Sequence, residues 1–133
     1  MPRKIFVNLP IESLDRSVEF FSQLGFTFNK QFTDEKATCM VISEDIYAML
    51  LVKPFFKTFI NTEIADAHQS TSAILALSVD SRAEVDTFVD KALKAGAKSP
   101  KPPQDHGFMY QRSFKDLDGH HWEIFWMSPE HVQ

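Results

Sequence analysis

Apolar positions along the chain change between short continuous runs and stretches with a helical period. Residues 5–9 are mostly apolar, which predicts a strand that is buried on both faces. Apolar residues then recur at helical spacing over 14–24. Ser13 stands where an N-cap is expected, and Gly25 stands where helices commonly end. The chain therefore opens with a strand followed by a helix.

Three further strands are predicted after this helix. Residues 26–32 and 37–42 are rich in strand-forming residues, and the polar stretch 33–36 between them reads as a turn. A third apolar run covers 48–52, and Pro54 marks its end. The first half of the chain thus has the order strand, helix and three strands.

The second half repeats this order. Residues 73–79 form another apolar run, and helical periodicity returns over 85–93. The prolines within 100–103 allow at most an edge strand. Two closing strands are predicted at 108–114 and 122–126.

When Gly25 is aligned with Gly96, the two predicted helices superpose. This alignment indicates an internal repeat of about half the chain length. The repeat predicts one α+β domain built from two βαβββ modules. The expected boundaries are about 3–56 for the first module, about 57–71 for a linker and about 72–128 for the second module, within a domain of residues 1–133.

Composition narrows the class of protein. The 133 residues carry a net charge of −4 and 44% hydrophobic residues, an ordinary globular composition. Mild acidity without a basic patch argues against a nucleic-acid partner. No apolar run approaches the roughly 20 residues of a membrane span. Cys39 is the only cysteine, which fits a reducing compartment, so we expect a cytoplasmic protein.

Two segments resemble the vicinal-oxygen-chelate superfamily, the group of glyoxalases, bleomycin resistance proteins and extradiol dioxygenases. The first is LDRSVEFF at 14–21, and the second is DLDGHHWE at 116–123, where Leu117 stands in place of the family's proline. The resemblance covers nearly the whole chain. It implies that the two modules form an incomplete mixed β-barrel around a central cleft, with the helices outside.

The resemblance also implies a divalent metal in the cleft, with ligands from the first and last strand of each module. The matching positions are Phe6, Leu50, Ile74 and Glu123. Only Glu123 offers a ligand for a hard cation, whereas a specific site needs three or four. We therefore expect no family metal site and no cofactor.

Strand periodicity suggests which side chains line the cleft. It places Asn8 on the face of Phe6, and it places His121 and Phe125 on the face of Glu123, with Trp122, Ile124 and Trp126 toward the helices. The segment before the seventh strand could form a loop over the cleft that brings Tyr110 or His106 to a ligand, and the alternative is a simple turn around Gly107. The candidate binding residues are Phe6, Asn8, Leu50, Ile74, Ser78, Tyr110, His121 and Phe125.

Glu123 is the candidate catalytic residue. A carboxylate in an apolar strand is costly to bury unless it is paired, and a carboxylate in such a place can serve as a general base. The alternative is a structural glutamate that is hydrogen-bonded to Asn8, Arg112 or water.

Three hypotheses for function follow. The first is a metal-independent protein that binds a small, largely apolar or aromatic molecule. The second is a metal-dependent lyase or extradiol dioxygenase with a rearranged site at His121 and Glu123. The third is a non-catalytic structural or interaction dimer. A homodimer is expected on family grounds, and exposed strand edges give a physical reason for it.

Overall fold

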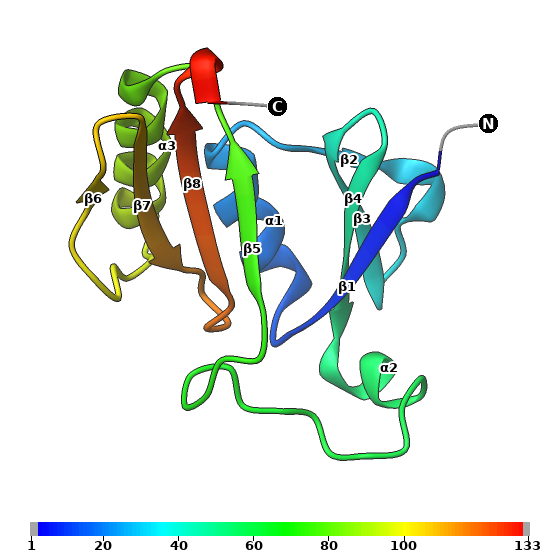
Figure 1. The fold of residues 1–133 in the computed structure, drawn as a ribbon. Helices are drawn as coiled ribbons and strands as arrows, with labels where there is room; N and C mark the ends of the chain where they lie inside the picture. The colour runs from blue at the N-terminus through cyan, green and yellow to red at the C-terminus, as the bar shows by residue number, and fades with distance from the viewer. Residues whose placement is uncertain (1–2, 132–133) are drawn as a thin grey trace. The chain divides into compact units, whose positions relative to one another are not determined.

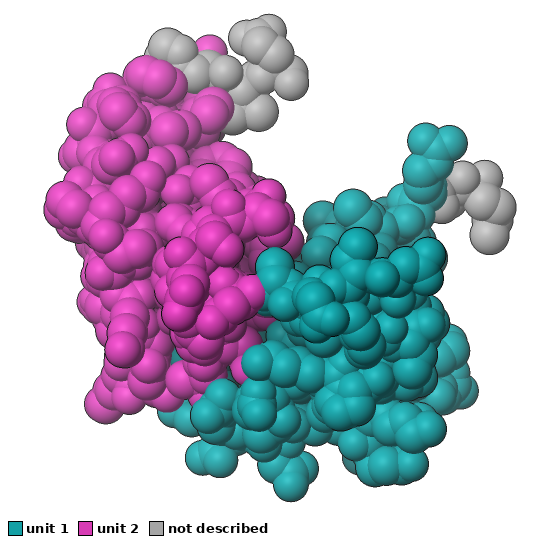
Figure 2. All heavy atoms as spheres, turned by 90° about the horizontal axis from the view of Figure 1, so that it is seen from below, with its two compact units in different colours: residues 1–65 teal, residues 66–133 magenta. Residues whose placement is uncertain are grey.

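The computed structural model describes residues 3–131, and the chain divides into two compact units, residues 1–65 and residues 66–133. Figure 2 colours the units separately. Each unit has the order strand, helix and three strands. The predicted α+β class with two βαβββ modules is therefore confirmed. Within the described residues, no helix combines the length and the apolar character needed to cross a membrane.

Unit 1 is a four-stranded mixed sheet with the strand order β1-β4-β3-β2 (Figure 1). Its β1 and β4 are parallel, and the other neighbours are antiparallel. The elements are β1 Ile5–Ile11, α1 Leu14–Gln23, β2 Thr27–Asn29, a 3₁₀ turn Lys30–Phe32, β3 Ala37–Ser43, β4 Ile46–Val52 and α2 Lys53–Lys57.

Unit 2 repeats this topology with the strand order β5-β8-β7-β6, in which β5 and β8 are parallel. Neither sheet closes on itself, because each has two edge strands. The elements are β5 Ile74–Ser78, α3 Arg82–Lys94, β6 Gln104–Asp105, β7 Met109–Lys115, β8 His121–Met127 and a 3₁₀ turn Pro129–His131.

Both long helices begin and end at residues that satisfy their free backbone groups. Ser13 Oγ accepts a hydrogen bond from the backbone N–H three residues later at 3.3 Å, and Ser81 Oγ does the same for α3 at 3.1 Å. Gly25 and Gly96 follow the two helices with φ of 98° and 117°. The predicted cap at Ser13 and both glycine stops are confirmed.

The predicted strand 26–32 is too long. β2 ends at Asn29, and the next three residues form the 3₁₀ turn. The Asn29 side chain accepts a hydrogen bond from the backbone N–H of Gln31 at 2.9 Å. An asparagine that bonds to its neighbouring backbone favours a turn over a continued ladder.

The prediction that β1 is buried on both faces is also wrong. Ile5 is 55% exposed and Phe6 is 47% exposed, whereas Leu9 and Ile11 are buried. Because β1 is an edge strand of its sheet, its first residues have a strand neighbour on one side only. An apolar run alone does not distinguish such an edge from a central strand.

In unit 2, α3 packs against one face of β7 and β8. Its buried side chains, Val85, Val89 and Ala92, recur at helical spacing. Phe114 and Trp122 are buried in these strands, and their rings stack with centroids 6.3 Å apart. The opposite face of the sheet is consequently the one left for a site.

Candidate functional site

Strand register places Glu123 in the middle of one face of the unit 2 sheet. Ser113 of β7 lies opposite Glu123 in the antiparallel pair, and Ala76 of β5 lies beside it in the parallel pair. Cross-strand partners share a face, and side chains alternate along each strand. We call this surface the Glu123 face. Its residues are Ile74, Ala76, Ser78, Gln111, Ser113, Lys115, His121, Glu123 and Phe125.

The Glu123 face is open along β5 and closed toward β7. Ile74 is 56% exposed, whereas Ser113 is only 1% exposed. The side chains of His121 and Glu123 lie between these limits, at 11% and 13% exposure. The carboxylate is therefore partly withdrawn from water but reachable from the β5 side.

Two basic side chains contact the same oxygen of Glu123. Lys101 Nζ lies 3.3 Å from Oε2, and His121 Nε2 lies 3.4 Å from Oε2. The histidine nitrogen is buried without an aligned hydrogen bond, so its contact with Glu123 is one of proximity. Lys101 is thus the charge partner of this carboxylate, and the pair is partly shielded from solvent.

Lys101 reaches the carboxylate from the proline-rich segment 98–103. Two backbone hydrogen bonds tie Lys98 to Lys115, at 3.1 and 2.7 Å, and anchor the start of this segment on β7. Ser99 Oγ donates to the carbonyl of Lys101 at 3.0 Å, which restrains the residue itself. A segment without regular structure therefore supplies the counter-ion of Glu123.

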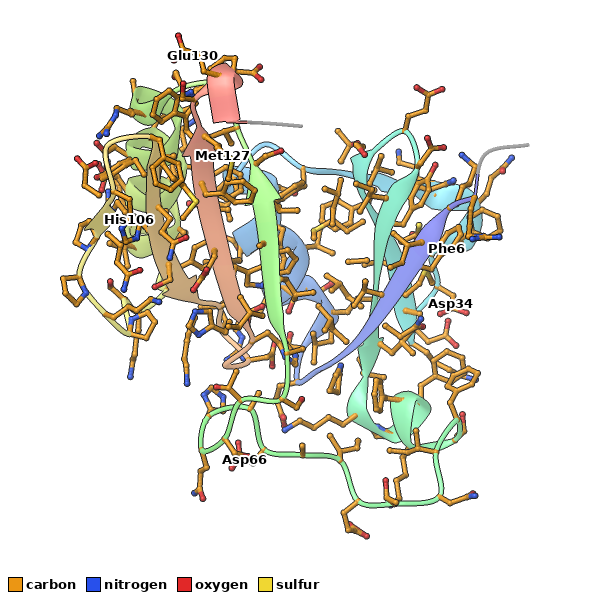
Figure 3. The ribbon with its side chains drawn as sticks, viewed as in Figure 1. Phe6, Asp34, Asp66, His106, Met127 and Glu130 are labelled. Carbon is orange, nitrogen blue, oxygen red and sulfur yellow. The ribbon has the colours of Figure 1, made fainter. Side chains whose placement is uncertain are left out.

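A hollow of about 730 Å³ lies where β5 and β8 end. Because these strands are parallel, their carboxyl ends meet at one edge of the sheet. Figure 3 labels Met127 on β8 and Glu130 on the turn that follows it. Phe125 lines the hollow two residues beyond Glu123, roughly 7 Å along the strand. The lining residues are Ser78, Val79, Asp80, Phe125, Trp126, Met127 and Pro129.

The structure brings five of the sequence-predicted site residues together on the Glu123 face. These residues are Ile74, Ser78, His121, Glu123 and Phe125. Arg82 of α3 lies over the ring of Trp126, 5.2 Å from its centroid, so Trp126 points to the helix side as expected. Whether the five residues contact a ligand stays a prediction.

Tyr110 lies in β7 and not in a loop over the cleft, and its side chain is not on the Glu123 face. It pairs with Trp126 in the register of β7 and β8, and therefore faces α3. Its hydroxyl donates to Asp86 Oδ1 at 2.6 Å. This hydrogen bond, with burial, raises the pKa of Tyr110. The side chain is committed to the helix–sheet packing.

In unit 1, the register corrects one of the three predicted residues. Phe6 and Asn8 share a face of β1, where Phe6 stacks on Tyr47 with centroids 4.7 Å apart. Asn8 Nδ2 donates to the carbonyl of Phe6 at 3.1 Å. Leu50 pairs with Leu9, is fully buried and lies on the opposite face. The residue that pairs with Asn8 is Met49.

The side chains at the family's ligand positions do not fit a divalent cation. Phe6 and Ile74 offer no lone pair, and Met49 offers only a thioether, which hard cations disfavour. At Glu123, Lys101 already neutralises the oxygen that faces it. Among residues 3–131, no three or more His, Cys, Asp or Glu side chains lie close enough together to hold a metal ion.

Comparisons with known proteins agree with the fold. A family model described as the Glyoxalase/Bleomycin resistance protein/Dioxygenase superfamily matches residues 5–124. A hypothetical protein from S. aureus is 27% identical, with 94% of each chain covered and a TM-score of 0.79.

Two more distant structures show the same fold. A glyoxalase-related enzyme from Fulvimarina pelagi is 18% identical, with 95% of this chain and 88% of that chain covered and a TM-score of 0.80. The fosfomycin resistance protein FosX from Mesorhizobium loti is 14% identical, with 98% and 96% covered and a TM-score of 0.70. No curated protein matches the chain.

Proposed function

The chain belongs to the glyoxalase/bleomycin resistance protein/dioxygenase superfamily, and we propose that it binds a small, largely apolar or aromatic molecule on the Glu123 face without a metal ion. The pairing of Glu123 with Lys101 is the observation that supports this most, because an ammonium group of the chain itself balances the charge of this carboxylate. Neither side chain then requires a metal ion for charge balance.

Apolar side chains on β5 and at the end of β8 supply the contact area. Ile74 is exposed on β5, and Phe125 and Met127 line the hollow at the end of β8. Small-molecule sites are concave and mostly apolar, with a few polar groups that orient the ligand. Ser78, Ser113, His121 and Glu123 are among the polar groups on this face.

A second candidate function is a metal-dependent lyase or dioxygenase. It is favoured by one observation, the 3.4 Å between His121 Nε2 and Glu123 Oε2, since the two side chains could act as neighbouring ligands. Lys101 argues against it because its ammonium group competes for the same oxygen. Proton transfer by Glu123 is compatible with either candidate.

Toluene, in buffer with EDTA, is a suitable first probe of the proposed function. We expect saturable binding with a Kd on the order of 1 mM, the range for so few atoms. Amide shifts in an NMR titration should move at Phe125 and Met127. Phe125→Ala should weaken binding about fivefold or more, because it removes an aromatic contact surface.

Phe32→Ala is the matched control, since Phe32 is 59% exposed in unit 1 and lies outside the proposed site. Its binding should equal that of the wild type. Binding that appears only after a divalent ion is added, or that is unchanged by Phe125→Ala, would contradict the proposal.

A further inference from the structure

Two buried polar atoms on the Glu123 face lack a hydrogen-bond partner among the described residues. They are Ser113 Oγ and His121 Nε2. Ser113 is 1% exposed, so water does not reach its hydroxyl freely. More than about 90% of buried polar groups in proteins are hydrogen-bonded, and each exception calls for a physical reason.

Both atoms flank the same carboxylate. Ser113 lies directly opposite Glu123 across the strand pair, and His121 Nε2 lies 3.4 Å from Glu123 Oε2. Side chains directly opposite each other in such a pair have Cβ atoms roughly 5 Å apart. A single small group placed between them can therefore reach all three side chains.

The opposite face of the same sheet has no such unpaired atoms among the side chains that contact α3. Tyr110 donates to Asp86 at 2.6 Å, and Arg112 donates to Asp86 and Asp90 at 3.1 and 2.9 Å. Polar groups between the sheet and the helix are thus satisfied within the protein. The two unsatisfied groups both lie on the Glu123 face, which α3 does not cover.

We propose that Ser113, His121 and Glu123 form a subsite for one hydroxyl group carried on an aromatic or apolar ligand. The proposal rests on the proposed function and specifies its ligand. A hydroxyl both donates and accepts, so it can donate to the Glu123 carboxylate and accept from the Ser113 hydroxyl. Its second lone pair can accept from His121 when that ring carries its proton on Nε2.

The charge and polarity of the subsite disfavour other substituents on the ligand. Lys101 balances Glu123, so this ion pair itself carries no net positive charge to attract an anion. A carboxylate would meet the charge of Glu123, and a methyl group would leave the buried polar atoms unpaired. The ligand class is therefore a phenol or an alcohol rather than an acid or a hydrocarbon.

Toluene, phenol and benzoate test this inference, because they differ at one substituent on the same ring. We expect phenol to bind wild-type protein about tenfold tighter than toluene in the NMR titration, the gain from a hydrogen bond to a charged acceptor. Benzoate should bind no tighter than toluene. In Glu123→Gln and Ser113→Ala the preference for phenol should fall to about twofold or less, with toluene unchanged.

Two matched substitutions in unit 1 serve as controls for the Ser113 and Glu123 variants. Ser113→Ala removes an unpaired buried hydroxyl, so we expect it to fold at least as well as the wild type. Ser43→Ala and Glu35→Gln change exposed residues of unit 1 and should keep the full preference.

The outcomes separate this inference from the proposed function. Equal binding of toluene and phenol to wild-type protein would overturn the hydroxyl subsite and leave the proposed function standing. Tightest binding of benzoate would also overturn it, since Lys101 would then anchor an anion. Binding of neither toluene nor phenol would overturn both.

Discussion

Replacing Asp116 by alanine is expected to destabilise unit 2 by about 3–5 kcal/mol, because three N–H groups lose their acceptor at once. Asp116 is 7% exposed and lies between β7 and β8. Its Oδ1 accepts from the backbone N–H groups of Asp118 and His120 at 3.0 Å each. Its Oδ2 accepts from Trp122 Nε1 at 2.9 Å. Burial raises the pKa of this carboxyl, and these donors oppose the rise.

Urea unfolding followed by tryptophan fluorescence measures this effect, since both tryptophans, Trp122 and Trp126, lie in unit 2. Asp66→Ala is the matched control in the same unit. It removes one exposed hydrogen bond, from His68 N at 3.0 Å, and should cost less than about 1 kcal/mol. An equal loss of stability in the two variants would contradict the role assigned to Asp116.

Gly119→Ala is expected to cost about 3 kcal/mol or more in the same assay. Gly119 has φ of 88°, where an alanine loses roughly 1–2 kcal/mol. A Cβ there would also lie 2.8 Å from the backbone of Ala67 and His68. Backbone atoms yield less easily than side chains, so overpacking adds to the conformational cost.

Gly107→Ala separates these two contributions. Gly107 has φ of 81°, but a Cβ there would have no atom within 4 Å. It should therefore show the conformational cost alone, and the difference between the two variants should be about 1–3 kcal/mol. Equal unfolding midpoints for the two alanine variants would show that the 66–70 backbone does not constrain this turn.

The fold could be predicted from the sequence because its strongest signals are local and occur twice. Ser13 as a cap and Gly25 and Gly96 as stops need only a few neighbouring residues to act. The limits of β2 could not be predicted in this way, because the side chain of Asn29 competes with the sheet ladder for backbone donors.

Part of the site follows from hairpin symmetry. Asp118 lies midway between β7 and β8, so Ser113 and Glu123, which are equally distant from it, must pair. The same symmetry pairs Tyr110 with Trp126, which strand periodicity already assigned to the helix side. The sequence therefore suffices to predict that Ser113 lies opposite Glu123 and that Tyr110 faces the helix.

Other parts of the site depend on long-range contacts. The prediction placed Leu50 on the face of Asn8, whereas the structure places Met49 there. The register could not be predicted because β4 pairs in parallel with β1 across a long connection, and no turn sets the register of that pair. A shift of one residue reverses which face a side chain occupies. Lys101 lies in a proline-rich segment without periodicity, so no pattern in the sequence indicates its contact with Glu123.

The most direct test of a metal-independent Glu123 face is the metal content of the purified protein, with titration calorimetry of Ni²⁺, Zn²⁺, Mn²⁺ and Fe²⁺. Wild type and Glu123→Gln should be compared, because Glu123 carries the only carboxylate at a family ligand position. We expect no divalent ion at one per chain and the same titration heats for both proteins. One equivalent of a divalent ion per chain that is lost in Glu123→Gln would contradict metal-independent binding on this face.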